Sequence, residues 1–178
     1  MSEIEKSEDK KIVLRPMLSN EDAVIIARET LKNLEPGIRA PEIGDKMPDG
    51  TIYAGVSPDT NEPMFVMAQD VPLTMIFNQA KKYASKIDAH GHNDWRLPTK
   101  AELNVLFQNK DKGSLKGTFN VNSSDHASCY WSDTLYDDFN AFGQSFDNGH
   151  QSYYGKTQHS SVRCVRYGTG KAAPSQNI

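Results

Sequence analysis

The stretch DWRLPTKAELNVLF, residues 94–107, decides the fold. Its first part should be extended, because Pro98 disfavours a helical conformation for the residue before it. Thr99 and Glu102 then form the T-x-x-E pattern of a capping box, in which each side chain satisfies a free backbone N–H at the start of a helix. The apolar positions that follow at helical spacing are Leu103, Leu106 and Phe107. The stretch therefore predicts an extended segment that turns directly into a helix.

The sequence on both sides alternates between helix and strand signals. Upstream, residues 51–54 and 64–67 are short apolar runs that predict a hairpin, and residues 75–87 have the pattern of an amphipathic helix. Downstream, residues 109–128 predict a loop. Strand-like runs follow at residues 129–132, 141–146 and 162–167, and the Asp-Asn-Gly at residues 147–149 predicts a hairpin turn. The run 141–146 alternates so that one face should be core. The prediction is an α+β domain with two helices around small antiparallel sheets.

A few large side chains are predicted to hold this domain together. Trp95 and Trp131 should be buried anchors, since each brings a large apolar surface. Arg96 is expected to pair with a carboxylate or to cap loop carbonyls. Arg163 and Arg166 stand three apart in a strand-like run, so they should face opposite sides, with one structural and one exposed.

Short motifs along the chain carry a family resemblance. They are IGD at residues 43–45, DGT at 49–51, DWRLPT at 94–99, EL at 102–103, YWS at 130–132, FDNG at 146–149 and VRCVR at 162–166. The order and spacing of these motifs resemble those of the bacterial Lcl C-terminal domain family, and the resemblance covers residues 43–167. The resemblance implies a C-type-lectin-like fold in which the first and last strands of the domain pair. It also implies an adhesin-like binding module, because members of the family tend to be recognition domains of adhesins, tail fibres and cell-surface proteins.

The two ends of the chain lie outside this resemblance. Residues 1–11 are polar and predict a disordered tail, as do residues 168–178. Residues 12–40 form an appendage in which a short apolar run precedes an amphipathic helix, capped by Ser19 or Asn20 and ended by Pro36-Gly37. This extra N-terminal helix is interpreted as a docking helix, an oligomerisation element or a lid.

Composition narrows the classes of partner. The chain has 20 basic and 23 acidic residues, a net charge of −3, and no clustered basic face of the kind that binds nucleic acid. No apolar run approaches the roughly 20 residues needed to span a bilayer. The N-terminal residues lack the apolar region of a secretory signal, which predicts a cytoplasmic protein unless a partner or a particle carries it out of the cell.

The sequence offers little support for a cofactor or a catalytic centre. Cys129 and Cys164 are expected to be structural, as buried thiols or as a disulfide. Glu62-Pro63 is followed by Met64, so the calcium motif of sugar-binding lectins fails, and no cofactor is predicted. His90-Gly91-His92 is interpreted as the end of a helix rather than as a metal site. No enzyme is predicted; a copper oxidase of the formylglycine-generating type, using the two cysteines, remains an alternative.

The segment 136–159 is the candidate binding surface. Its tyrosines, asparagines and small polar residues have the composition of antibody paratopes. The predicted ligand-binding residues are Tyr136, Asp138, Asn148, His150, Gln151, Tyr153 and Tyr154. Because Tyr153 and Tyr154 are adjacent, only one should be displayed if the chain is extended. The sequence thus predicts a non-catalytic module that binds a protein or a glycan. An assembly subunit of a phage or secretion particle, docking through the N-terminal helix, is the alternative.

Overall fold

The structure is a computed structural model that describes residues 40–122 and 126–168. The predictions for the tail 1–11, for the N-terminal helix of the 12–40 appendage and for the tail after Gly168 lie outside the described residues. The helices and strands, in chain order, are β1 (Ile52–Val56), β2 (Pro63–Val66), α2 (Phe77–Ala84), α3 (Lys100–Asn109), β3 (Cys129–Leu135), β4 (Asn140–Ser145), β5 (Gln151–Gly155) and β6 (Val165–Tyr167). Two 3-10 turns, η1 (Gly113–Leu115) and η2 (His126–Ser128), interrupt the predicted loop.

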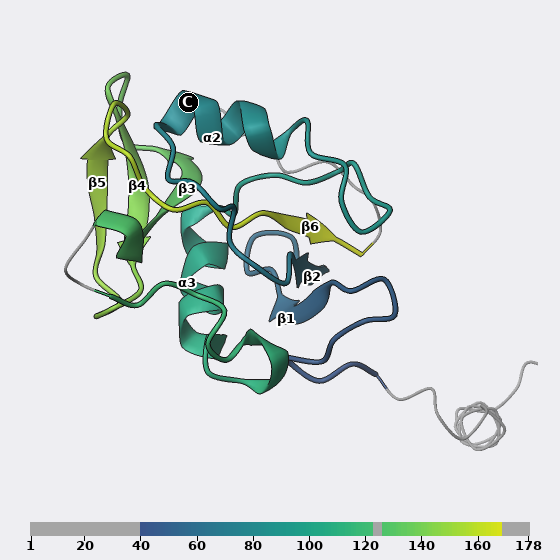
Figure 1. Ribbon diagram of the computed structural model, residues 1–178. Helices are drawn as coiled ribbons and strands as arrows, with labels where there is room; N and C mark the ends of the chain where they lie inside the picture. The colour runs from purple at the N-terminus through teal and green to yellow at the C-terminus, as the bar shows by residue number, and fades with distance from the viewer. Residues whose placement is uncertain (1–39, 123–125, 169–178) are drawn as a thin grey trace, which may run out of the picture. The chain divides into compact units, whose positions relative to one another are not determined.

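The strands form two antiparallel sheets of three strands each, which confirms the α+β prediction. The first sheet has the order β1-β2-β6 and the second the order β3-β4-β5. Helix α3 lies between them and contacts strands of both, whereas α2 packs against β3 of the second sheet (Figure 1). The last strand pairs with β2 and not with β1, so the pairing of first and last strands that the resemblance implied is wrong. The hairpin β1–β2 was predicted correctly, but β6 adds to the side of β2 that β1 leaves open.

The start of α3 is built as the capping box predicted. The Glu102 backbone N–H donates to Thr99 Oγ1 at 3.2 Å, and the Thr99 N–H donates to Glu102 Oε2 at 2.9 Å. The predicted pairing of Arg96 with a carboxylate is confirmed, since its guanidinium donates to both oxygens of Glu102 at 2.6 and 2.8 Å. Ser57 and Tyr167 donate their hydroxyl protons to the same carboxylate at 2.6 and 2.8 Å. Glu102 therefore joins α3 to the ends of β1 and β6.

The charge of Glu102 is preserved although the side chain is fully buried. Burial alone would raise the pKa of this carboxyl, but the hydrogen bonds and charge of Arg96 outweigh it and hold the pKa below its ordinary value. Arg96 also stacks its guanidinium over the Tyr167 ring, 4.2 Å from the ring centroid. The motif residues Arg96 and Glu102 are thus a structural ion pair.

The prediction for the other two arginines is wrong, because both are buried. Arg163 donates to Asp70 at 2.7 Å and to the Met67 carbonyl at 2.8 Å. Arg166 donates to both carboxylate oxygens of Asp94 at 2.8 and 3.2 Å. The strand alternation does not apply, since β6 begins only at Val165 and leaves Arg163 in the preceding irregular segment. Each arginine instead meets a carboxylate from a distant loop.

Two apolar clusters fill the interior, and the tryptophans anchor the second of them as predicted. Trp95 and Trp131 are 2% and 0% exposed, and their indole N–H groups donate to the Ala89 and Met75 carbonyls. The first cluster is centred on α3 and the aromatic rings of Phe119, Tyr130 and Phe146. Strand β4 has buried residues on both faces, contrary to the prediction of a single core face, because Ala141 packs in the second cluster while Gln144 on the other face meets Asn104 of α3. Phe142, on the same face as Gln144, is only partly buried.

Both cysteines are free thiols. Cys164 is fully buried, and burial raises the pKa of its thiol to about 12. Cys129 donates its S–H to the Tyr154 hydroxyl oxygen at 3.7 Å. Cys164 thus packs in the second apolar cluster, and Cys129, partly buried at the start of β3, contacts Tyr154.

Candidate functional site

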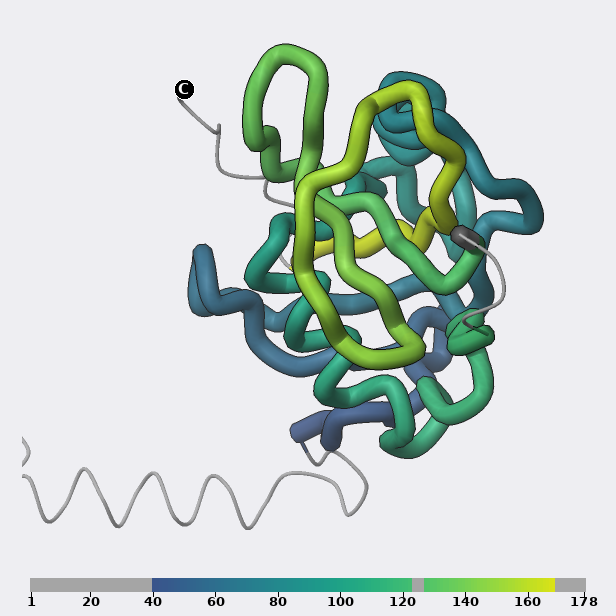
Figure 2. Tube along the Cα trace, turned by 90° about the vertical axis from the view of Figure 1, so that its left-hand side faces the viewer, coloured from purple at the N-terminus to yellow at the C-terminus, as the bar shows by residue number. Residues whose placement is uncertain are grey.

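The predicted binding segment does not form one surface, because the second sheet separates its two turns. The β3–β4 turn lies at one end of the sheet and the β4–β5 turn at the other, as Figure 2 shows at the upper and lower ends of these green strands. A strand of six residues spans about 20 Å. Asn148 and His150 therefore lie far from Tyr136 and Asp138, although the sequence analysis grouped them.

Three aromatic rings come together on one face of the second sheet, and we call Tyr136, Phe142 and Tyr153 the aromatic shelf. The rings of Tyr136 and Tyr153 stack in parallel, with centroids 4.2 Å apart and planes 6° apart. The edge of Phe142 meets Tyr136 at 5.6 Å, and the Lys100 ammonium lies 3.9 Å from the centroid of the Phe142 ring. Tyr136 and Tyr153 remain 53% and 50% exposed. The shelf is thus ordered but open to solvent.

Tyr154, which was predicted to bind ligand, is not part of the shelf. It points to the other face of β5, where its ring meets the edge of Trp131 with centroids 6.4 Å apart. Burial raises the pKa of its hydroxyl, and the hydrogen bond from Cys129 adds to this shift. The alternation expected for adjacent tyrosines in a strand holds, and Tyr153 is the displayed one.

The β3–β4 turn beside the shelf projects from the body of the molecule and is held from two sides (Figures 1 and 2). The Asp137 carboxylate accepts from the backbone N–H groups of Phe139 and Asn140 at 2.8 and 2.7 Å. The Asn140 side chain also donates to Asp137, and these hydrogen bonds hold the pKa of Asp137 below its ordinary value. Lys156 donates to the carbonyls of Asp137 and Asp138 at 3.0 and 2.9 Å. Phe139, at the tip, is 80% exposed.

A polar hollow of about 350 Å³ adjoins the shelf, and we call it the polar pocket. Its polar lining comes from Asp59, Thr99, Lys100, Asn104, Thr134 and Gln151. Gln151 and Tyr153 are on the same face of β5, since they pair with Gln144 and Phe142 of β4. Lys100 borders both areas, because its ammonium covers Phe142. The shelf and the pocket are therefore continuous.

The β4–β5 turn, at the other end of the sheet, is an ordinary hairpin turn. Asn148 Oδ1 accepts from the His150 N–H at 2.8 Å, and Gly149 has the positive φ that this hairpin turn requires. This confirms the predicted Asp-Asn-Gly turn. Of the predicted ligand-binding residues, Tyr136, Asp138, Gln151 and Tyr153 belong to the shelf, its turn or the pocket, and Asn148 and His150 do not.

The His-Gly-His segment fastens a loop instead of ending a helix. Helix α2 already ends at Ala84. His90 Nδ1 lies 2.9 Å from the Asp49 carbonyl, and His92 Nε2 lies 2.8 Å from Asp49 Oδ2. Desolvation raises the pKa of Asp49, but the His92 hydrogen bond and those from Thr51 prevail and lower it to about 2. Within the described ranges, no three His, Cys, Asp or Glu side chains form a group that could hold a metal ion.

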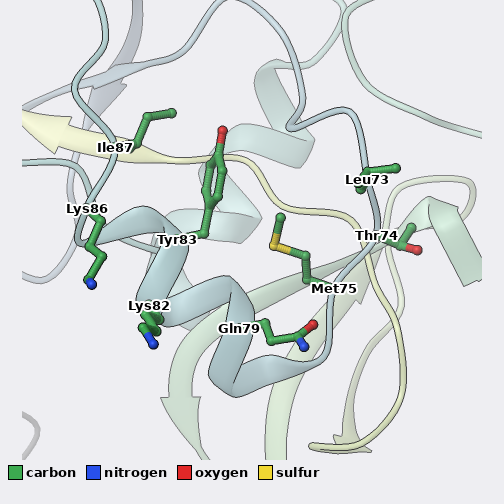
Figure 3. Close-up of a pocket in the computed structure, with 8 residues that line it drawn as sticks. All are labelled: Leu73, Thr74, Met75, Gln79, Lys82, Tyr83, Lys86 and Ile87. Atoms are coloured by element: carbon green, nitrogen blue, oxygen red, sulfur yellow. The ribbon is translucent and has the colours of Figure 1, made fainter.

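A second hollow, of about 490 Å³, follows α2. Figure 3 shows Leu73 and Ile87 at its two ends, with Met75 and Tyr83 between them. This hollow lies on the other face of the second sheet from the shelf, because Met75 and α2 cover the face that carries Trp131. Its lining is more apolar than that of the polar pocket, and Leu73 is 70% exposed.

These features define a small α+β domain that displays an aromatic shelf next to a polar pocket. The family model for the Lcl C-terminal domain matches residues 56–166, and the chain belongs to this family. The match includes the shelf, the pocket and both tryptophans, and it leaves out the motifs at residues 43–45 and 49–51. No curated protein matched the chain. In the part of the chain that the structure describes, no helix is long and apolar enough to cross a bilayer.

Sequence analysis missed most of the polar pocket. Asp59 lies in the β1–β2 loop, Lys100 and Asn104 on α3, and Thr134 near the end of β3, so no single local motif contains all four. The one available signal was the i, i+4 spacing of Lys100 and Asn104, which places both on one side of the helix. That spacing is common on exposed helix faces and predicts no site by itself.

Proposed function

We propose that this domain is a non-catalytic recognition module that binds its ligand on the aromatic shelf. The observation that carries the proposal is the parallel stack of Tyr136 and Tyr153, half exposed on a rigid sheet. Tyrosine supplies a large contact area and a polar hydroxyl at a low cost in conformational entropy, which is why it dominates binding surfaces. The stack, Phe142 and the exposed Phe139 together offer a ligand an apolar surface with polar groups around it.

The rigidity of this surface supports a binding role. Tyr153 and Phe142 are paired in neighbouring strands, and the turn that follows Tyr136 is fixed by Asp137 and Lys156. A surface that is already ordered loses little side-chain and loop freedom on association, so more of the contact energy appears as affinity. The geometry is therefore suited to a ligand that docks without rearranging the domain.

The ionisable groups inside the domain support a role without catalysis. Arg96, Glu102, Arg163 and Arg166 all serve ion pairs that join distant segments. A copper oxidase needs a metal site that substrate can reach, yet Cys164 is fully buried inside the second apolar cluster. This argues against the copper-oxidase alternative. The assembly-subunit alternative depends on the N-terminal helix, which lies outside the described residues, and it stays a prediction.

We further propose that the architecture is C-type-lectin-like. Two helices with two small antiparallel sheets, and a C-terminal strand that joins the sheet of the first two strands, support this, although β6 pairs with β2 and not with β1. An experimental structure that superposes on C-type-lectin-like domains over both sheets would agree with the proposal. One in which the sheets pack without α3 between them would contradict it.

Paired substitutions at the two ends of the second sheet test the binding role. The full chain would be screened on a glycan array and a protein array to find a ligand. We expect Tyr136→Ala and Tyr153→Ala to weaken its binding at least tenfold, because each removes half of the stack; a tenfold loss corresponds to about 1.4 kcal/mol. His150→Ala, at the opposite end, is the matched control and should bind as the unaltered chain does. Equal binding by all three variants would reject the proposal.

A further inference from the structure

We propose that the polar pocket takes one unit of an uncharged saccharide, whose neighbouring unit lies against the aromatic shelf. This inference rests on the proposed function, because the shelf and the pocket form one surface. It adds the chemical class of the ligand and a second set of residues that select it. The supporting observation is that pocket side chains have hydrogen-bond donors and acceptors that no protein group among the described residues uses.

Each of four polar side chains in the pocket makes a hydrogen bond within the protein and keeps another donor or acceptor for a ligand. Asn104 Oδ1 accepts from Gln144 at 3.0 Å, so the N–H donors of the Asn104 amide remain unused in the described part of the chain. Gln151 Nε2 donates to the Lys100 carbonyl at 2.8 Å, which leaves the Gln151 carbonyl oxygen as an acceptor. Thr134 Oγ1 accepts from the Lys100 N–H at 2.9 Å and keeps its own proton to donate. Asp59 Oδ2 accepts from the Thr99 hydroxyl, and Oδ1 remains.

The groups left over are a mixture of donors and acceptors held in place before any ligand arrives. Among the described residues, the Asn104 amide, the Gln151 carbonyl, the Thr134 proton and Asp59 Oδ1 have no other hydrogen-bond partner. A sugar hydroxyl both donates and accepts, so neighbouring hydroxyls can satisfy a set of this kind. A ligand without hydroxyls would leave these groups unpaired, which penalises its binding.

The charge of the pocket favours a neutral ligand. Asp59 is its one carboxylate, and the Lys100 ammonium is turned to the Phe142 ring. None of the described residues that line the pocket is an arginine. Sulfate and phosphate groups are bound by cationic side chains, arginine above all, and a lone carboxylate repels them. The exposed Asp138 at the nearby turn adds to this repulsion.

The shape of the surface fits a chain of sugar rings. A volume of about 350 Å³ is at the lower end of the range for small-molecule sites. The apolar face of a second ring can then lie on the half-exposed Tyr153, two residues along β5 from Gln151. Side-chain hydrogen bonds and ring stacking hold such a ligand, so binding should not require calcium.

Binding of the full chain to immobilised cellohexaose, maltohexaose, chitohexaose and mannohexaose, with heparin as the polyanion, tests the inference. All measurements are made in EDTA. We expect at least one neutral hexasaccharide to bind and heparin not to bind. Asn104→Asp keeps the acceptor for Gln144 but loses the free donor. Asp59→Asn keeps an acceptor for Thr99 but turns the free acceptor into a donor. Each should weaken binding of that hexasaccharide about tenfold, the effect of one lost hydrogen bond.

Asn148→Asp is the matched control, because it makes the same chemical change at the far turn and keeps the acceptor for His150. Its affinity should equal that of the unaltered chain, and thermal unfolding should show that all variants are folded. The inference is overturned if no neutral hexasaccharide binds, if heparin alone binds, or if both pocket variants keep full affinity.

Variants of the shelf separate this outcome from failure of the proposed function. If Tyr153→Ala weakens binding of any array ligand while Asn104→Asp and Asp59→Asn do not, the shelf is a binding surface and the pocket inference is wrong. If neither the shelf nor the pocket variants change binding, both proposals are wrong.

Discussion

At the scale of single residues, the motif DWRLPT is explained by a buried carboxylate and not by a ligand. Glu102 accepts from Arg96, Ser57, Tyr167 and its own helix cap, so one side chain ties four segments of the chain together. The family motif in this region is therefore expected to specify the fold, although Thr99 at its end also lines the polar pocket.

Removing this carboxylate should be far more damaging than removing an exposed one. Glu102→Ala leaves Arg96 as an uncompensated, largely buried charge, and we expect a loss of about 3–5 kcal/mol in the free energy of unfolding. Asp111→Ala is the control: it also removes a carboxylate that pairs with a basic side chain, but Asp111 is 72% exposed, and such pairs contribute about 0–1 kcal/mol. Urea unfolding measures both. Similar losses in the two variants would mean that the Glu102 network contributes little.

At the scale of elements, the turn at Gly44 and the turn at residues 112–114 are in direct backbone contact. The carbonyl of Gly44 accepts from Ser114 at 2.8 Å, and a Cβ atom on Gly44 would lie 2.5 Å from the Lys112 carbonyl oxygen. The turn before β1 is thereby fixed to η1, beyond the C-terminal end of α3. Only glycine permits this approach, which explains the glycine in the IGD motif.

A pair of glycine substitutions isolates this contact. Gly44 and Gly117 both have a positive φ, so alanine is strained at either position. A Cβ on Gly117 would meet no atom within 4 Å. We expect Gly117→Ala to cost about 1–2 kcal/mol from backbone strain alone. Gly44→Ala should cost about 1–3 kcal/mol more, because backbone atoms must move apart. Thermal unfolding compares them, and equal losses would show that the turn relaxes freely.

The elements also show which parts of the fold the sequence could predict. The capping box at Thr99, the Asp-Asn-Gly turn and the β1–β2 hairpin depend on residues close together in the chain, and all were predicted. The pairing of β6 with β2 and the packing of α3 on the second face of β4 depend on which elements become neighbours, and local patterns carry no such information. The burial of Arg163 was missed because its partner Asp70 is 93 residues away.

The same distinction applies to the candidate site. Tyr136 and Tyr153 were predicted because exposed aromatic residues in a polar segment are a compositional signal. Asn148 and His150 were grouped with them only because a hairpin brings its two turns close in sequence while it holds them a strand length apart. Asp59 and Asn104 were missed because the polar pocket exists only after four separate segments have packed.

At the scale of the whole molecule, several carboxylates make stability depend on pH. The pKa of Asp49 falls from 3.8 to about 2 on folding, and those of Asp94 and Glu102 are also lowered. A carboxyl with a lowered pKa stabilises the fold above its unfolded-state pKa, and this contribution disappears as the pH falls through the folded-state value. The domain should therefore lose stability steadily as the pH drops below 3.8 toward 2.

Asp49→Asn tests one part of this dependence. The variant replaces the carboxylate that contacts His92 and accepts from Thr51, so it should be less stable than the unaltered chain at neutral pH. Its further loss between pH 4 and pH 2 should be smaller, because one titrating group is missing. Urea midpoints measured across that interval give both quantities. Parallel curves for the two chains would show that Asp49 contributes nothing to acid unfolding.

The position of β6 has a consequence for how the protein is made. Strand β2 pairs with β1 on one side and with residues 165–167, the last of these strands to be synthesised, on the other. A ribosome must therefore release nearly all of the domain before the first sheet is complete, and until then the nascent chain presents an open strand edge. Long-range pairing of this kind also slows folding. Chaperone demand during synthesis should accordingly be governed by the final few residues of the domain.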